Sequence, residues 1–153
     1  MRLTHIIVFL AAAFSLMTAQ AASPADQLVI SAGEPEAVLL CLPLEQGARF
    51  HLDFINSIYL APVRETFVYE PSVGISIIMV ESPSAGVFEY YGLVPDKPGV
   101  AFLRRPVGEM RIRSHDYENH RLTIGDRSVR FKGLVADGEP LTIKIRTGES
   151  CGA

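Results

Sequence analysis

The sequence predicts an all-β fold, either an antiparallel β-sandwich or a partly closed β-barrel of roughly 8–10 short strands. Short runs rich in β-branched and apolar residues recur along the chain, and Gly, Pro, Asn and Asp residues separate them. Several runs alternate between apolar and polar residues, which is typical of a strand with one face buried. No segment beyond residue 21 has a sustained 3.6-residue apolar period, so no helix is predicted there.

The first half of the chain provides five predicted strands. Two continuous apolar runs flank a Gly-Glu-Pro turn, two alternating runs flank an Asn-Ser turn, and an apolar run follows a Pro-Ser-Val-Gly turn. These strands are Leu28–Ser31, Ala37–Leu42, Arg49–Asn56, Val63–Tyr69 and Ile75–Val80.

The second half provides five more. One follows a Pro- and Gly-containing loop, one alternates Arg with apolar residues, and two flank the Gly125-Asp126 dipeptide, which is the tightest hairpin signal in the chain. The last alternates after an Asp-Gly-Glu-Pro turn. They are Val100–Leu103, Glu109–Arg113, Arg121–Ile124, Ser128–Lys132 and Leu141–Arg146.

Three polar residues lie at positions that the alternation assigns to the core. Asn56 continues the apolar face of RFHLDFIN, Glu65 interrupts the apolar face of VRETFVY, and His120 shares the phase of the apolar residues in HRLTI. Ser57 follows Asn56 and adds a hydroxyl. Because a buried carboxylate must be paired or hydrogen-bonded, we expect Asn56 and Glu65 to face each other near their loop, with Ser57 and His120 nearby. The cluster is either a closed hydrogen-bonded network or the floor of a small pocket for a polar solute.

The charges are distributed unevenly along a chain of net charge −3. Residues 22–103 carry 3 basic and 10 acidic side chains, whereas residues 104–132 carry 8 basic and 4 acidic ones. The outward phase of the later strands holds a candidate anion-binding face, alternatively an ordinary solvated sheet face. Its residues are Arg111, Arg113, Arg121, Arg130 and Lys132.

The two cysteines, Cys41 and Cys151, fit one disulfide if the protein occupies an oxidising compartment. The alternative is a buried Cys41 and an unpaired Cys151. Two cysteines at this spacing make no metal site, and the three histidines beyond residue 21 have no metal-ligand spacing. We therefore expect no metal and no cofactor.

No catalytic motif is recognisable in the chain. Ser114-His115-Asp116 contains the residue types of a hydrolytic triad, but adjacent residues on a strand point to opposite faces. Neither G-x-S-x-G nor Ser-x-x-Lys occurs. The net negative charge also disfavours nucleic-acid binding.

The first residues, MRLTHIIVFLAAAFSLMTAQAA, have the layout of a secretory signal peptide. Arg2 precedes an apolar run of 12 residues, Ile6–Met17, and Ala19-Gln20-Ala21 is an A-x-A cleavage pattern. A membrane-spanning helix would need about 20 apolar residues. We therefore expect a signal peptide over residues 1–21, a single β-domain over residues 22–153 without a transmembrane segment, and a soluble periplasmic or secreted product.

The block FINSIYLAPVRETF resembles the signature of the bacterial domain of unknown function 1850 family, in which a polar-Ser pair precedes Pro-Val-x-Glu. ESPSAGV is similar to the family's Gly-Ala-Gly turn, and NHRLTIGDRSVRFKGLVADGEPLTIKI to its closing strands; the likeness covers roughly residues 36–147. The family usually has His at the position of Asn56, so proton transfer by that residue cannot be carried over. Hydrogen bonding by an amide can be.

The resemblance implies a small exported protein without an established activity, often encoded beside tripartite ATP-independent periplasmic (TRAP) transporters with a TAXI-type solute-binding subunit. The expected function is a non-enzymatic accessory or small-solute-binding β-domain, with a small organic solute or a transporter component as partner. One alternative is a structural or assembly partner that uses the basic face or an edge strand. A hydrolase is a third hypothesis.

Export predicts a processed protein. The A-x-A pattern places cleavage after Ala21, so intact-mass measurement on protein from the native host should give a chain that begins at Ala22. A membrane-bound chain that retains Met1 would contradict this prediction.

Overall fold

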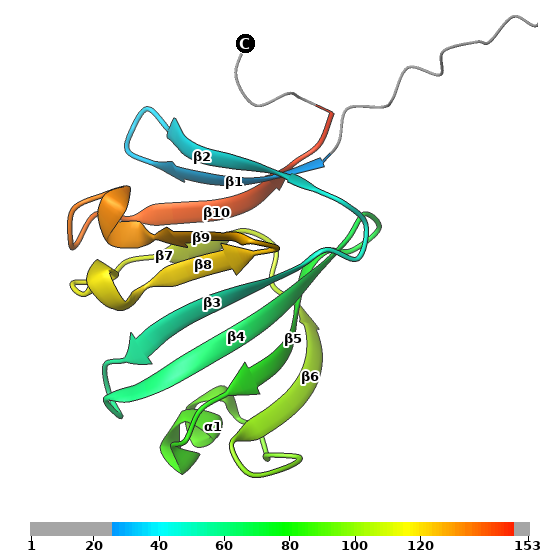
Figure 1. Cartoon of the computed structure of the whole chain (residues 1–153), viewed down its shortest axis with the longest axis vertical. Coiled ribbons are helices and arrows are strands. Elements are labelled where there is room, and N and C mark those ends of the chain that lie inside the picture. Colours follow the sequence, from blue (N-terminus) through cyan, green and yellow to red (C-terminus); the bar gives the residue numbers. More distant parts are fainter. Residues whose placement is uncertain (1–25, 149–153) are drawn as a thin grey trace, which may run out of the picture.

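The computed structural model describes residues 26–148, which form two antiparallel sheets that pack against each other (Figure 1). The first sheet has the strand order β2-β1-β10-β7, and the second has the order β6-β5-β4-β3-β8-β9. The predicted all-β class is confirmed, and of the two predicted architectures the chain adopts the sandwich.

All ten predicted strands are present within the described residues. The four-stranded sheet contains β1 (Asp26–Ala32), β2 (Ala37–Leu44), β7 (Met110–Ile112) and β10 (Leu141–Arg146). The six-stranded sheet contains β3 (Arg49–Asn56), β4 (Ala61–Glu70), β5 (Gly74–Glu81), β6 (Val100–Pro106), β8 (Arg121–Ile124) and β9 (Arg127–Arg130).

The core lies between the sheets, and the alternation predicted the inward face of β3 and β4. Phe50 of β3 lies opposite Phe67 of β4, and their rings stack with centroids 5.0 Å apart. From the other sheet, Ile30 of β1 and Ile143 of β10 are fully buried in the same cluster. Burial of these apolar side chains stabilises the sandwich by about 1.5–3 kcal/mol for each large residue.

One helix was not predicted. α1 (Ala85–Tyr91) connects β5 to β6, and it ends at Gly92, whose φ of 65° is the left-handed conformation that glycine adopts at helix ends. Only Val87 and Phe88 of its residues are buried. A helix of two turns is too short for an apolar period to emerge from its sequence, which explains the missed prediction.

α1 contacts the turn between β3 and β4 through a residue without a side chain. A Cβ atom placed on Gly86 would lie 2.3 Å from the ring of Tyr59. The absence of that atom allows the tyrosine ring to pack directly on the helix backbone.

The predicted strand Ser128–Lys132 ends two residues earlier than expected. β9 stops at Arg130, and the 3₁₀ turn η2 (Phe131–Gly133) follows, with Phe131 fully buried. A second 3₁₀ turn, η1 (Tyr117–Asn119), precedes β8. The hairpin at Gly125-Asp126 is confirmed, since Ile124 pairs with Arg127 across a two-residue turn.

The side chain of Tyr117 ties η1 to both neighbouring loops. Its ring is fully buried, and its hydroxyl shares its single proton between the main-chain oxygens of Glu139, at 2.5 Å, and Ile112, at 3.0 Å. These two oxygens lie at the end of β7 and before the start of β10. Burial raises the pKa of this hydroxyl, which keeps it protonated as a donor.

The predictions for the two termini concern residues outside the described part of the chain. The predicted signal peptide over residues 1–21 and the domain start at residue 22 lie outside residues 26–148. Cys41 lies in β2 and has no free thiol, but Cys151 lies outside the described residues, so their pairing stays a prediction. Within residues 26–148, no helix has the length and apolar character needed to cross a membrane.

Replacing Tyr117 by phenylalanine should destabilise the fold. Tyr117→Phe removes the buried donor that the two carbonyl oxygens share, so we expect the free energy of unfolding to fall by about 1–3 kcal/mol in urea denaturation. Tyr59→Phe is the matched control, because the hydroxyl of Tyr59 has no partner among residues 26–148 and the residue is 41% exposed. Equal stability of the two variants would contradict the role assigned to the Tyr117 hydroxyl.

Candidate functional site

A cavity of about 400 Å³ is lined by all four residues of the predicted polar cluster: Asn56, Ser57, Glu65 and His120. It lies between β3 and β4 on one side and β7 on the other, and α1 contributes Tyr90 and Tyr91. Its other polar lining residues are Arg111, Arg113 and Ser114. Phe54, Leu52 and Ile112 supply apolar walls. The cavity therefore combines residues from both sheets.

Asn56 shapes the turn at one end of this cavity. Its Oδ1 accepts the N–H groups of Ile58 and Tyr59, both at 3.0 Å, in the manner of an Asx turn. The register pairs Asn56 with Ala61 and Glu65 with Leu52, so the predicted opposition of Asn56 and Glu65 is wrong. They share a face but differ by four positions along the strands, which is about 13 Å.

Glu65 is a partly buried carboxyl group with one protein donor. The hydroxyl of Tyr91 donates to its Oε1 at 2.5 Å. Burial raises the pKa of Glu65, whereas this hydrogen bond and the charge of Arg105 act in the opposite direction. Its Oε2 accepts no hydrogen bond from residues 26–148 and is not buried, which leaves it accessible at the cavity.

His120 presents one ring nitrogen to its own loop. Nδ1 lies 2.7 Å from the main-chain oxygen of Asp116, and because a carbonyl oxygen only accepts, Nδ1 carries the proton. The ring packs in parallel with Phe54, with centroids 5.6 Å apart. In the neutral ring Nε2 is therefore an acceptor, and it has no partner within the described chain.

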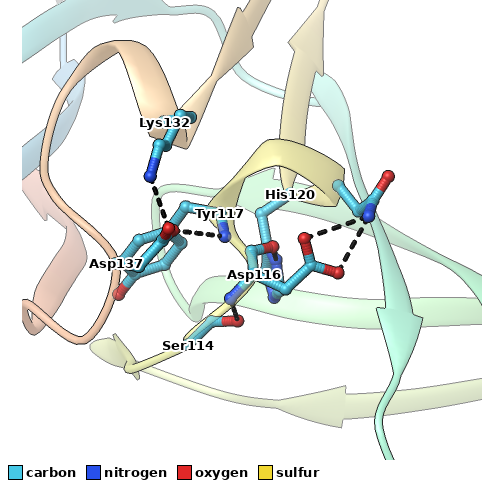
Figure 2. A network of polar contacts seen from close by, with 7 residues as sticks. Ser114, Asp116, Tyr117, His120, Lys132 and Asp137 are labelled. Atoms are coloured by element: carbon cyan, nitrogen blue, oxygen red, sulfur yellow. Dashed lines mark hydrogen bonds and ion pairs between the residues drawn. The ribbon is translucent and has the colours of Figure 1, made fainter.

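Figure 2 shows the network that holds the loop of His120. The main-chain N–H of Asp116 donates to Ser114 Oγ at 3.0 Å, and the carboxylate of Asp137 accepts the N–H of Tyr117. Lys132 also pairs with Asp137, and this contact holds the pKa of Asp137 below its usual range. Ser114-His115-Asp116 therefore forms a turn, and the Ser114 hydroxyl accepts a backbone bond rather than facing a base.

The closed-network hypothesis for the polar cluster is wrong. Within residues 26–148, no hydrogen bond joins Asn56, Ser57, Glu65 or His120 to another member of this set. Asn56 accepts N–H groups of its own turn, Glu65 accepts the hydroxyl of Tyr91, and His120 donates to the main-chain oxygen of Asp116. Asn56, Glu65 and His120 each have a local partner of their own, and the open-cavity alternative describes the arrangement.

The residues of the predicted basic face are exposed as expected, but they do not all lie on neighbouring strands. All five cationic residues are exposed, and Leu122 and Phe131 are buried behind them. Arg121 and Arg130 are cross-strand neighbours in the six-stranded sheet, but β7, which carries Arg111, belongs to the four-stranded sheet. The prediction of one continuous face on neighbouring strands is therefore wrong.

Most of these cations also have anionic partners. Arg111 pairs with Glu109 at 3.0 Å, Arg130 pairs with Glu118 at 2.7 Å, and Lys132 pairs with Asp137. Arg113 instead donates from Nε to the main-chain oxygen of Gly138 at 2.8 Å. Carboxylates next to the cations weaken an anion-binding role for the whole set.

The described part of the chain contains no candidate metal site. Among the described residues, no group of three or more His, Cys, Asp or Glu side chains is placed to hold a metal ion.

Comparisons with known proteins identify no relative for this chain. No protein-family model, no curated protein and no solved structure matches it. The resemblance to the domain of unknown function 1850 family stays a prediction.

The sequence did not predict the role of Tyr91 or the approach of β7. Tyr91 lies on α1, a helix too short to show an apolar period in its sequence. The positions of Arg111 and Arg113 at the cavity depend on how the two sheets pack, which the sequence does not show. The sequence places Tyr91 26 residues from Glu65, so no local signal joined the two.

The raised pKa of Glu65 predicts a pH-dependent stability. Below the ordinary carboxyl pKa of about 4.3 the group is protonated in both states, and its stabilising contribution is fully present. That contribution is lost as the pH rises through the raised pKa of the folded state. Wild-type protein should therefore lose stability relative to Glu65→Gln as the pH rises above about 4, by about 1.4 kcal/mol for each pH unit that separates the pKa of the folded state from that of the unfolded state.

Urea denaturation at several pH values tests this difference. Gln at position 65 can still accept the Tyr91 hydrogen bond, so only the ionisation is removed. Glu45→Gln, in the exposed turn between β2 and β3, controls for the change in net charge. Parallel pH profiles for wild type and Glu65→Gln would refute the assignment.

Proposed function

We propose that this protein is an exported, non-enzymatic β-domain that binds a small polar solute in the cavity lined by Asn56, Ser57, Glu65 and His120. The observation that carries the proposal is the pair of accessible acceptors, Glu65 Oε2 and His120 Nε2, which have no partner in residues 26–148 but line one cavity. A volume of about 400 Å³ is within the range of small-molecule sites.

The composition of the walls supports binding. Phe54 and Tyr90 offer apolar and aromatic surface, and a few polar groups at separate points can fix the orientation of a solute. Tyr91 holds Glu65 in place, and the stacked Phe54 ring together with the Asp116 oxygen holds His120. Groups that local partners fix before a ligand arrives cost less conformational entropy on binding.

The same contacts favour binding over catalysis. Ser114 lines the cavity and belongs to the Ser-His-Asp segment, but its Oγ accepts the main-chain N–H of Asp116. His120 uses Nδ1 for a carbonyl oxygen of its own loop, with no carboxylate behind it to form a triad. These features supply recognition without an activated nucleophile.

The accessory role near a TRAP-type transporter is the part of the proposal that rests on the family resemblance. Export rests on the predicted signal peptide over residues 1–21. A solute-binding module in the same compartment as an uptake system would contact either the solute or a transporter component.

A ligand screen tests the solute site. We expect at least one compound in a panel of small carboxylates, amino acids and sugars to raise the melting temperature of the processed protein. At a hundredfold excess over Kd, binding adds about 2.7 kcal/mol to the stability. Glu65→Gln should remove this stabilisation, whereas Glu45→Gln should retain it.

Two results would count against the site. One is a panel in which no compound stabilises the wild-type protein. The other is a stabilising compound that acts equally on wild type and Glu65→Gln, because its binding would then not involve the cavity carboxyl group.

A further inference from the structure

The cavity wall that the four-stranded sheet supplies is apolar. Met110 and Ile112 of β7 are partly buried and pack against the core. Because successive side chains of a strand point to opposite faces, Arg111 and Arg113 take the outer side. Ile112 is therefore the side chain that this part of the chain turns towards the cavity.

The two arginines have partners of their own. The side chain of Arg111 is 83% exposed, and its Nε bonds Glu109 at 3.0 Å. Arg113 donates from Nε to the main-chain oxygen of Gly138 at 2.8 Å. A ligand in the cavity therefore meets an apolar wall on this side, and the cavity offers no comparable partner for an anion there.

Apolar side chains also surround the carboxyl group of Glu65 on its own sheet. Leu52 of β3 lies directly opposite Glu65, and Phe54 lies diagonally across from it on the same inward face. Such diagonal neighbours are about 7–8 Å apart, which is within reach of an aromatic ring. Glu65 is therefore a polar group among largely apolar walls.

The carboxyl group lacks a cation in contact with it. Its donor among the described residues is the neutral hydroxyl of Tyr91, at 2.5 Å. Burial raises the pKa of Glu65, and Arg105 on β6 opposes that shift through its charge without lining the cavity. Oε2 remains accessible. A cationic donor that reaches Oε2 would supply both a hydrogen bond and the charge that offsets burial.

The second accessible polar atom of the site is also an acceptor. His120 donates from Nδ1 to the main-chain oxygen of Asp116, which leaves Nε2 of the neutral ring as an acceptor at the same cavity. A ligand that fits these two atoms brings hydrogen-bond donors. An ammonium group has three N–H donors and no acceptor.

We propose that the ligand is a primary amine with an apolar stem, whose ammonium group binds Glu65 Oε2 and whose stem packs on Leu52, Phe54 and Ile112. This inference rests on the proposed solute-binding function and names its ligand class. A carboxylate in the same position would meet the carboxyl group of Glu65 without a donor, and a neutral alcohol would bring a single donor and no charge.

Isothermal titration calorimetry on the processed protein can compare ligands that share one stem and differ in the polar end. 2-Phenylethylamine, 2-phenylethanol and phenylacetate present a cation, a neutral hydroxyl and an anion, and the N,N,N-trimethyl derivative of the amine keeps the charge without N–H donors. We expect 2-phenylethylamine to bind at least about tenfold more tightly than each of the other three. Methylamine, which has no stem, should bind more weakly than 2-phenylethylamine by a similar factor.

Variants assign each end of the ligand. Glu65→Gln keeps an acceptor for Tyr91 but removes the negative charge, so it should weaken 2-phenylethylamine by about tenfold or more and leave 2-phenylethanol unchanged. Glu45→Gln is the matched control, because it removes the same charge from an exposed turn that does not line the cavity. Ile112→Ala shortens the apolar wall and should weaken the amine and the alcohol by similar factors.

The outcomes separate this inference from the proposed function. Equal or tighter binding of the alcohol, the anion or the quaternary ammonium compound would overturn the primary-amine assignment, as would an amine affinity that is unchanged in Glu65→Gln. A compound from the broad screen that depends on Glu65, alongside five silent compounds here, would overturn the ligand class and leave a solute site. Failure of every compound in both experiments would overturn the proposed function itself.

Discussion

The pairing of β3 with β4 is the constraint on which the rest of the structure depends. Phe50 faces Phe67 and Leu52 faces Glu65 across this pair, so one register sets both the aromatic core and the position of the carboxyl group. On the opposite face, Arg64 bonds the carboxylate of Asp53 through two nitrogens, at 2.6 and 3.2 Å. A slip of one residue would bring the charged pair into the core and turn the aromatic pair to the outside.

The cavity exists because three connections meet at one end of this strand pair. Asn56 closes the turn between the strands, α1 brings Tyr91 to the carboxyl group, and the loop that Tyr117 anchors presents His120. Each connection satisfies its own backbone and side chains before it contributes to the cavity. The accessible acceptors are what remains after local hydrogen bonding is complete.

The sequence predicted local features of this arrangement much better than non-local ones. Alternation identified the strands and the inward direction of Asn56, Glu65 and His120, because side-chain direction follows from position along a strand. Sheet membership has no such local signal, and Arg111 of β7 was therefore assigned to one surface with the arginines of β8 and β9. The donor to Glu65 was missed for the same reason, since it comes from a short helix.

The contact between Gly86 and the ring of Tyr59 couples two borders of the cavity. It joins α1 to the turn between β3 and β4, so the helix cannot swing away without disturbing the hairpin tip. Tyr91 on that helix and Asn56 at that turn border the same cavity. The helix and the hairpin tip therefore form one packed unit, so a movement of either would displace two borders of the cavity together.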